Sequence, residues 1–102
     1  MSIAVARFKL GRVVCTQGAN NLIAEDSRFA KFVMESLGRH LRGDWGNLGK
    51  EDQLSNKRAL VDGSRLFSAY EVDGLPKIWV ITEAIGDDGC RASTCVLFPD
   101  EY

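Results

Sequence analysis

The chain has 102 residues, with 13 basic and 14 acidic side chains and a formal net charge of -1. This length suits one domain and is too short for two, and a hydrophobic content of 45% excludes the composition of a disordered chain. The charge balance argues against a duplex-binding protein, which needs an excess of Lys and Arg, although a local basic patch is compatible with it. We therefore expect a single domain over residues 1–102.

Cysteine and histidine usage argues against disulfide bonds and metal sites. The three cysteines are an odd number without a Cys-x-x-Cys pair, which is typical of reduced thiols in the cytoplasm. His40 is the only histidine, so neither a metal site nor another cofactor is expected. Charged residues interrupt the apolar stretch of residues 1–10, which suits neither a signal peptide nor a membrane span. We expect a cytoplasmic protein without membrane contact.

The N-terminal part predicts an extended segment and a short helix. Residues 3–16 are rich in residues that favour strands, and Gly11 interrupts them, which indicates a hairpin or a bent strand. Thr16 is a suitable cap for a short helix over residues 17–25, because its hydroxyl can accept from exposed amides. The extended segment is a candidate fourth strand for the sheet described below.

A longer helix follows and is the clearest element of the sequence. Asp26 or Ser27 caps it, and Gly43 ends it. A weaker helix is expected over residues 50–61. The apolar stripe of the long helix has helical spacing and consists of Phe29, Phe32, Val33, Leu37 and Leu41.

The second half of the chain reads as strands. Residues 65–72 and 77–83 alternate in polarity, and the Asp73-Gly74 pair between them predicts a hairpin. A loop over residues 85–91 leads to a last strand over residues 93–98. We therefore expect an α+β domain, with two to three N-terminal helices packed on one face of a three- to four-stranded antiparallel meander.

Several motifs resemble a family of small bacterial proteins. Four segments carry the resemblance: HLRGDWG at 40–46, RLFSAY at 65–70, IWVITEA at 78–84 and TCVLFPDEY at 94–102. Asp52 and Asn56 match an acidic and an amide position of the same family. The family is usually labelled "plasmid-related protein", which implies a home on mobile genetic elements and no defined activity. It usually has a short D-R-S turn after the T-E-A strand, whereas residues 85–93 are longer here. If that Asp-Arg pair is functional, this chain has lost or displaced it.

Four residues are candidates for catalysis. His40 suits a general base because its free pKa lies near neutrality, but a structural histidine that bonds the following loop is the alternative. Asp44 suits an acid–base partner, or else caps its turn by accepting from the amides just after it. With Arg65 as a phosphate-binding residue, His40 and Glu83 form a possible ribonuclease set. The alternative for Arg65 and Glu83 is that they are unrelated polar residues on exposed strand faces.

Two loops offer a different kind of site. Asp44 and Trp45 lie in the loop after the long helix, and Asp87 and Asp88 lie in the acidic loop between the last two strands. Loops on a rigid scaffold often carry function, so we expect these four residues to contact a partner. Trp45 either stacks on a base or fills a partner's pocket, or it closes the core beneath its own loop.

The leading hypothesis is a non-enzymatic interaction protein of a mobile genetic element, which presents a surface to a host protein such as a defence complex. The first alternative is a small RNA-cleaving toxin that uses His40, Arg65 and Glu83. The second is a structural or regulatory homodimer that pairs through an exposed sheet edge. A nucleic-acid partner is compatible with the sequence but is not favoured. Phe67, Tyr70 and Trp79 either form an exposed aromatic patch or, as is more frequent, pack in the core.

Overall fold

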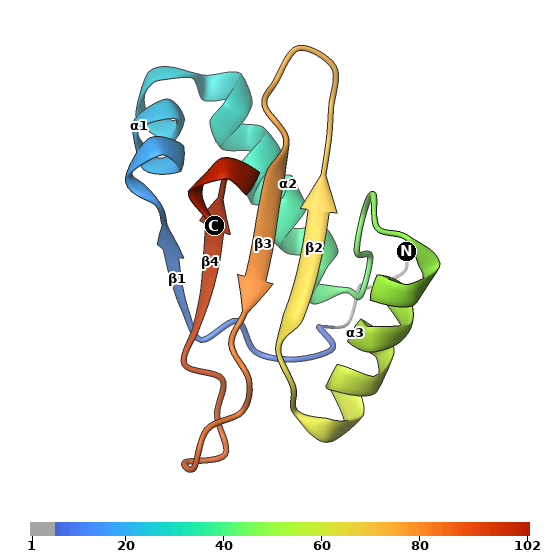
Figure 1. The fold of residues 1–102 in the computed structure, drawn as a ribbon. Helices are drawn as coiled ribbons and strands as arrows, with labels where there is room; N and C mark the ends of the chain where they lie inside the picture. The colour runs from blue at the N-terminus through green and yellow to red at the C-terminus, as the bar shows by residue number, and fades with distance from the viewer. Residues whose placement is uncertain (1–5) are drawn as a thin grey trace, which may run out of the picture.

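The computed structural model describes residues 6–102, in which three α-helices and a four-stranded sheet form an α+β fold (Figure 1). In chain order, the elements are β1 (Arg12–Cys15), α1 (Gln17–Glu25), α2 (Ser27–Leu41), α3 (Lys50–Asp62), β2 (Leu66–Tyr70), β3 (Ile78–Thr82), β4 (Ser93–Leu97) and the short 3-10 helix η1 (Pro99–Glu101). The predicted helices and C-terminal strands are confirmed. The extended segment predicted over residues 3–16 begins outside the described residues, and its described part contains β1. No helix of the described part is long and apolar enough to cross a membrane.

The sheet is mixed, with the strand order β1-β4-β3-β2. The predicted meander is confirmed, because β2 pairs with β3 and β3 with β4 in antiparallel fashion. The expectation of a wholly antiparallel sheet is wrong, because β1 runs parallel to β4 at one edge. The reason lies in the connection that follows β1. This connection leads directly into α1, so β1 has to point to the end of the sheet at which α1 lies. Strand β4 points to the same end, and the two strands are therefore parallel (Figure 1).

Helix α2 supplies the core that covers one face of the sheet. Asp26 caps its N-terminus, because its carboxylate accepts from the amides of Arg28 at 2.9 Å and Phe29 at 3.2 Å. The apolar side chains of α2 then meet alternate residues of β2, β3 and β4. The buried cluster consists of Phe29, Phe32, Val33, Tyr70, Ile78, Val80 and Val96. Tyr70 therefore belongs to the core and not to an exposed patch.

Helix α3 and the loop before it cover the outer edge of β2. The side-chain amide of Asn56 donates to the carbonyl of Phe67 at 2.6 Å and accepts from its amide at 3.0 Å. Further along the edge, the backbone of Trp45 and Asn47 bonds that of Ala69. A side chain thus replaces the missing neighbouring strand, which protects the edge from pairing with another chain.

The opposite face of the sheet has no α-helix against it in the described part of the chain. In Figure 1, α1 and α2 lie behind the sheet and α3 lies beside β2, while η1 lies on the near side. The strand pairings direct alternate residues to this near side, which we call the open face. On this face Phe67, Trp79 and Cys95 are half-buried, whereas Ala69, Ile81 and Leu97 are buried beneath neighbouring side chains.

Candidate functional site

His40 lies inside the protein, between α2 and the sheet. It is fully buried, and its Nδ1 lies 2.5 Å from the hydroxyl of Ser68. Its Nε2 lies 2.8 Å from the hydroxyl of Thr82, which lies 2.7 Å from that of Thr94. Thr94 in turn donates to the carbonyl of Leu10 at 2.7 Å. The chain of bonds therefore crosses β2, α2, β3 and β4 and reaches the N-terminal segment.

The number of available protons decides which group donates in each of these hydrogen bonds. Each hydroxyl has a single proton, and that of Thr94 goes to Leu10. Thr82 must therefore donate to Thr94, and His40 must donate to Thr82 through Nε2–H. Nδ1 then carries no proton and accepts from Ser68. Both ring nitrogens are occupied in the neutral tautomer.

Burial keeps His40 neutral. It lowers the pKa of the ring to about 4, and the positive charge of Arg91 lowers it further in the same direction. A general base has to reach a substrate proton, whereas this ring is covered and already bonded on both sides. The ring of His40 thus has a structural role. It bonds hydroxyls of β2 and β3, and it packs edge to face against Trp45 of the loop that follows α2.

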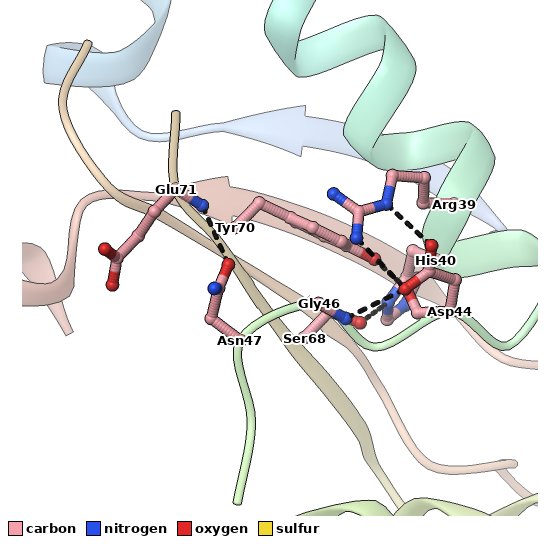
Figure 2. A network of polar contacts seen from close by, with 8 residues as sticks. All are labelled: Arg39, His40, Asp44, Gly46, Asn47, Ser68, Tyr70 and Glu71. Carbon is pink, nitrogen blue, oxygen red and sulfur yellow. Dashed lines mark hydrogen bonds and ion pairs between the residues drawn. The ribbon is translucent and has the colours of Figure 1, made fainter. Parts of the chain in front are cut away.

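Asp44 holds the loop after α2 in place (Figure 2). Its carboxylate accepts two bonds from the guanidinium of Arg39, at 2.7 and 3.1 Å, and one from the amide of Gly46 at 3.2 Å. The bonds from Arg39 hold the pKa of this carboxyl below its usual value. The carbonyl of Asp44 also accepts from the hydroxyl of Tyr70 at 2.7 Å. The turn-capping interpretation of Asp44 thus describes what its side chain does here.

Trp45 and the acidic loop differ in how accessible their side chains are to a partner. Trp45 is only 8% exposed, and its ring stacks on Phe8 with centroids 6.3 Å apart. The interpretation in which Trp45 closes the core matches this packing. Asp87 and Asp88 are exposed, and Asp88 accepts from the amide of Cys90 at 3.0 Å within its turn. Their role as contact points stays a prediction.

Arg65 and Glu83 lie on the same side of the sheet as the open face and form an ion pair at 3.5 Å. His40 lies on the other side, where it contacts Ser68 and Thr82. The sheet itself therefore separates the three residues of the ribonuclease hypothesis. The structure does not bring His40, Arg65 and Glu83 into one cleft.

An aromatic hollow lies beside this ion pair. The rings of Phe67 and Trp79 meet edge to face with centroids 5.1 Å apart, and Tyr102 meets Trp79 in the same way at 5.8 Å. The guanidinium of Arg65 donates to the hydroxyl of Tyr102 at 3.0 Å. Together with Ile81, these residues line a hollow of about 210 Å³. Of the aromatic patch considered from the sequence, Phe67 and Trp79 thus face outward, half-buried.

Three structural residues escaped sequence reasoning. Asn47 and Asn56 supply side-chain bonds to the edge of β2. Arg91 is buried, and its guanidinium donates to the carbonyls of Ala59, Ser64 and Glu83. It thereby joins the loop before β4 to the end of α3. The match of Asn56 to a motif was the only signal for any of them.

Among residues 6–102, no group of three or more His, Cys, Asp or Glu side chains is placed to hold a metal ion. Comparisons with known proteins found no match to this chain among family models, curated proteins or solved structures. The resemblance to the plasmid-related family therefore stays a prediction.

Proposed function

We propose that the protein is a non-enzymatic interaction module that binds a protein partner on its open face. The observation that carries this proposal is the aromatic hollow around Trp79, on a side of the sheet that no α-helix of the described chain covers. Two of its rings belong to neighbouring strands, so the sheet holds them in fixed positions before a partner arrives. Aromatic residues that reach the surface beside an arginine are typical of the centre of protein interfaces.

The charges beside the hollow favour a protein over a nucleic acid. Arg65 is paired with Glu83, and Lys77 with Glu71 at 3.1 Å. The pairing offsets the positive charge that would otherwise attract the phosphates of a strand stacked on Trp79. A polypeptide with charges of both signs fits the same rim.

A binding role also agrees with the state of the candidate catalytic residues. The nitrogens of His40 are bonded on both sides, and Asp44 is bonded by Arg39. Neither side chain is free to move a proton in a substrate. The resemblance to proteins of mobile elements would make the partner a host protein, for example a defence complex.

The test compares two substitutions of large apolar residues. Trp79→Ser removes the central ring of the hollow, whereas Met34→Ser alters an exposed residue of α2. Immobilised wild-type protein is used to recover a stoichiometric partner from a bacterial lysate, and the purified partner is then titrated against each variant. We expect Trp79→Ser to weaken binding about 30-fold or more, and Met34→Ser to leave it unchanged.

Two results would count against this role. One is the absence of a stoichiometric partner, and the other is binding that Trp79→Ser does not weaken. Sedimentation at two protein concentrations adds a separate check. A homodimer that Trp79→Ser dissociates would mean that a second copy of the chain occupies the open face, as in the homodimer alternative.

A further inference from the structure

A second and larger hollow lies away from the open face, beside α3. Its volume is about 530 Å³, within the range of small-molecule sites in proteins. Four of the side chains that line it are cationic, namely Arg7, Arg42, Lys50 and Lys57. Trp45 and Leu60 supply an apolar wall.

Three separate parts of the chain bring these cations together. The amide of Arg7 donates to the carbonyl of Leu41 at 2.8 Å, which fixes the N-terminal segment against the end of α2. Arg42 is the C-terminal cap of α2. Lys50 and Lys57 lie on one face of α3, because seven residues make two helical turns. The convergence therefore depends on the fold and not on a run of basic residues.

The four cations of this hollow make no ion pair with any carboxylate among residues 6–102. Four ion pairs occur among residues 6–102, and they engage Lys31, Arg39, Arg65 and Lys77. None of the four lining cations takes part in one, and no Asp or Glu lines the hollow. Asp44, which follows Arg42 closely in the chain, is bonded by Arg39. The wall of the hollow is therefore positively charged, although the net charge of the whole chain is -1.

We propose that this hollow binds a small organic phosphate of the nucleoside-phosphate class. Guanidinium and ammonium groups are the usual protein partners of phosphate oxygens, and the apolar wall suits the flat body of a nucleoside. A polynucleotide fits less well, because Glu51 and Asp52 lie in the first turn of α3, next to Lys50. A strand that continued past the hollow would meet these carboxylates.

The test is titration calorimetry of the wild-type protein with ATP, with inorganic pyrophosphate and with a 20-nucleotide single-stranded DNA. We expect saturable, salt-sensitive 1:1 binding of ATP and weaker binding of the other two per site. Lys57→Gln should weaken ATP binding about tenfold. Arg58→Gln is the matched control, since Arg58 is an exposed neighbour on α3 that does not line the hollow.

Each other result overturns the proposal. If ATP shows no saturable binding at millimolar concentration, the hollow is not a nucleotide site. If Lys57→Gln and Arg58→Gln weaken ATP binding equally, the binding is unspecific charge attraction. If pyrophosphate binds as tightly as ATP, the apolar wall does not contribute to binding. If the DNA binds more tightly than ATP, the hollow is part of a polynucleotide site. The Trp79→Ser protein should bind ATP like the wild type, so this outcome is independent of the protein partner proposed above.

Discussion

At the scale of single residues, His40 shows how burial decides the role of a titratable group. Its ring is fully buried, and each nitrogen bonds a hydroxyl of a different strand. A buried polar group costs free energy unless it is hydrogen-bonded. Every group of this hydrogen-bond network, from the Ser68 hydroxyl to the Leu10 carbonyl, has a partner. The same bonds that stabilise the neutral ring exclude it from proton transfer.

His40 should make the protein less stable in mild acid. The pKa of the ring is about 4 in the folded state and about 6.5 when the chain is unfolded. The unfolded chain therefore binds a proton between these values that the folded chain does not, and stability falls as the pH falls. We expect the free energy of unfolding in urea to drop by about 2 kcal/mol between pH 7 and pH 5 from this residue, and less in a His40→Gln variant.

A direct reading is available because His40 is the only histidine. Its ring proton resonances in the NMR spectrum should stay at their neutral positions from pH 7 down to about 5. A titration midpoint near 6.5 would contradict the assignment of His40 as a buried, neutral member of the hydrogen-bond network.

At the scale of elements, the stability of the sheet depends on the groups that bond the outer edge of β2. The outer edge of β2 is bonded by the side chain of Asn56 and by the loop that contains Trp45 and Asn47. A glycine makes the close approach of that loop feasible. Gly46 has φ +73°, and a β-carbon there would collide with the carbonyl oxygen of Ala69.

Asn56→Ala should destabilise the fold by about 2–3 kcal/mol. It leaves the amide and carbonyl of Phe67 at the edge of β2 without their bonds, and the helix above restricts access of water to them. Ser55→Ala is the control, because Ser55 is the exposed neighbour of Asn56 on α3. The measurement is urea unfolding at pH 7. Equal stability of the two variants would show that the edge does not depend on this side chain.

Gly46→Ala should cost more than Gly89→Ala. Both glycines have a positive φ, +73° and +79°, so each alanine variant has an unfavourable backbone conformation worth about 1 kcal/mol. A β-carbon at Gly89 has no neighbour within 4 Å, whereas one at Gly46 meets the backbone of β2. We expect the difference in unfolding free energy to exceed about 1 kcal/mol, because the loop has to move away from the edge. Similar losses for both variants would contradict the close contact between loop and strand.

At the scale of the whole molecule, two apolar clusters share one sheet. Tyr70 belongs to the cluster under α2 and Leu66 to the cluster under α3, and both lie on β2. Neither cluster can therefore lose its packing without disturbing the strand that the other needs. This shared strand predicts that the two clusters unfold together.

The two tryptophans can test this coupling. Trp45 reports on the cluster under α3, and Trp79 reports on β3, whose Ile78 and Val80 belong to the cluster under α2. Single-tryptophan proteins, made by Trp45→Phe and Trp79→Phe, should each unfold in urea with a fluorescence transition that coincides with the loss of helix measured by circular dichroism. Two separated transitions within one variant would show that the clusters unfold independently.

The sequence by itself determined approximately where the three helices and the strands β2 to β4 lie. Capping residues, the apolar stripe of α2 and the alternation in β2 to β4 act over a few residues, so they can be recognised locally. They could not show the direction of β1, since alternation carries no direction, or the burial of His40, whose partners lie 28 and 42 residues away. For the candidate sites too, the sequence showed one part and the tertiary structure decided the other. The residue types were visible, but which face of the sheet received Arg65 and Trp79, and which cations met beside α3, depended on packing between segments distant in the chain.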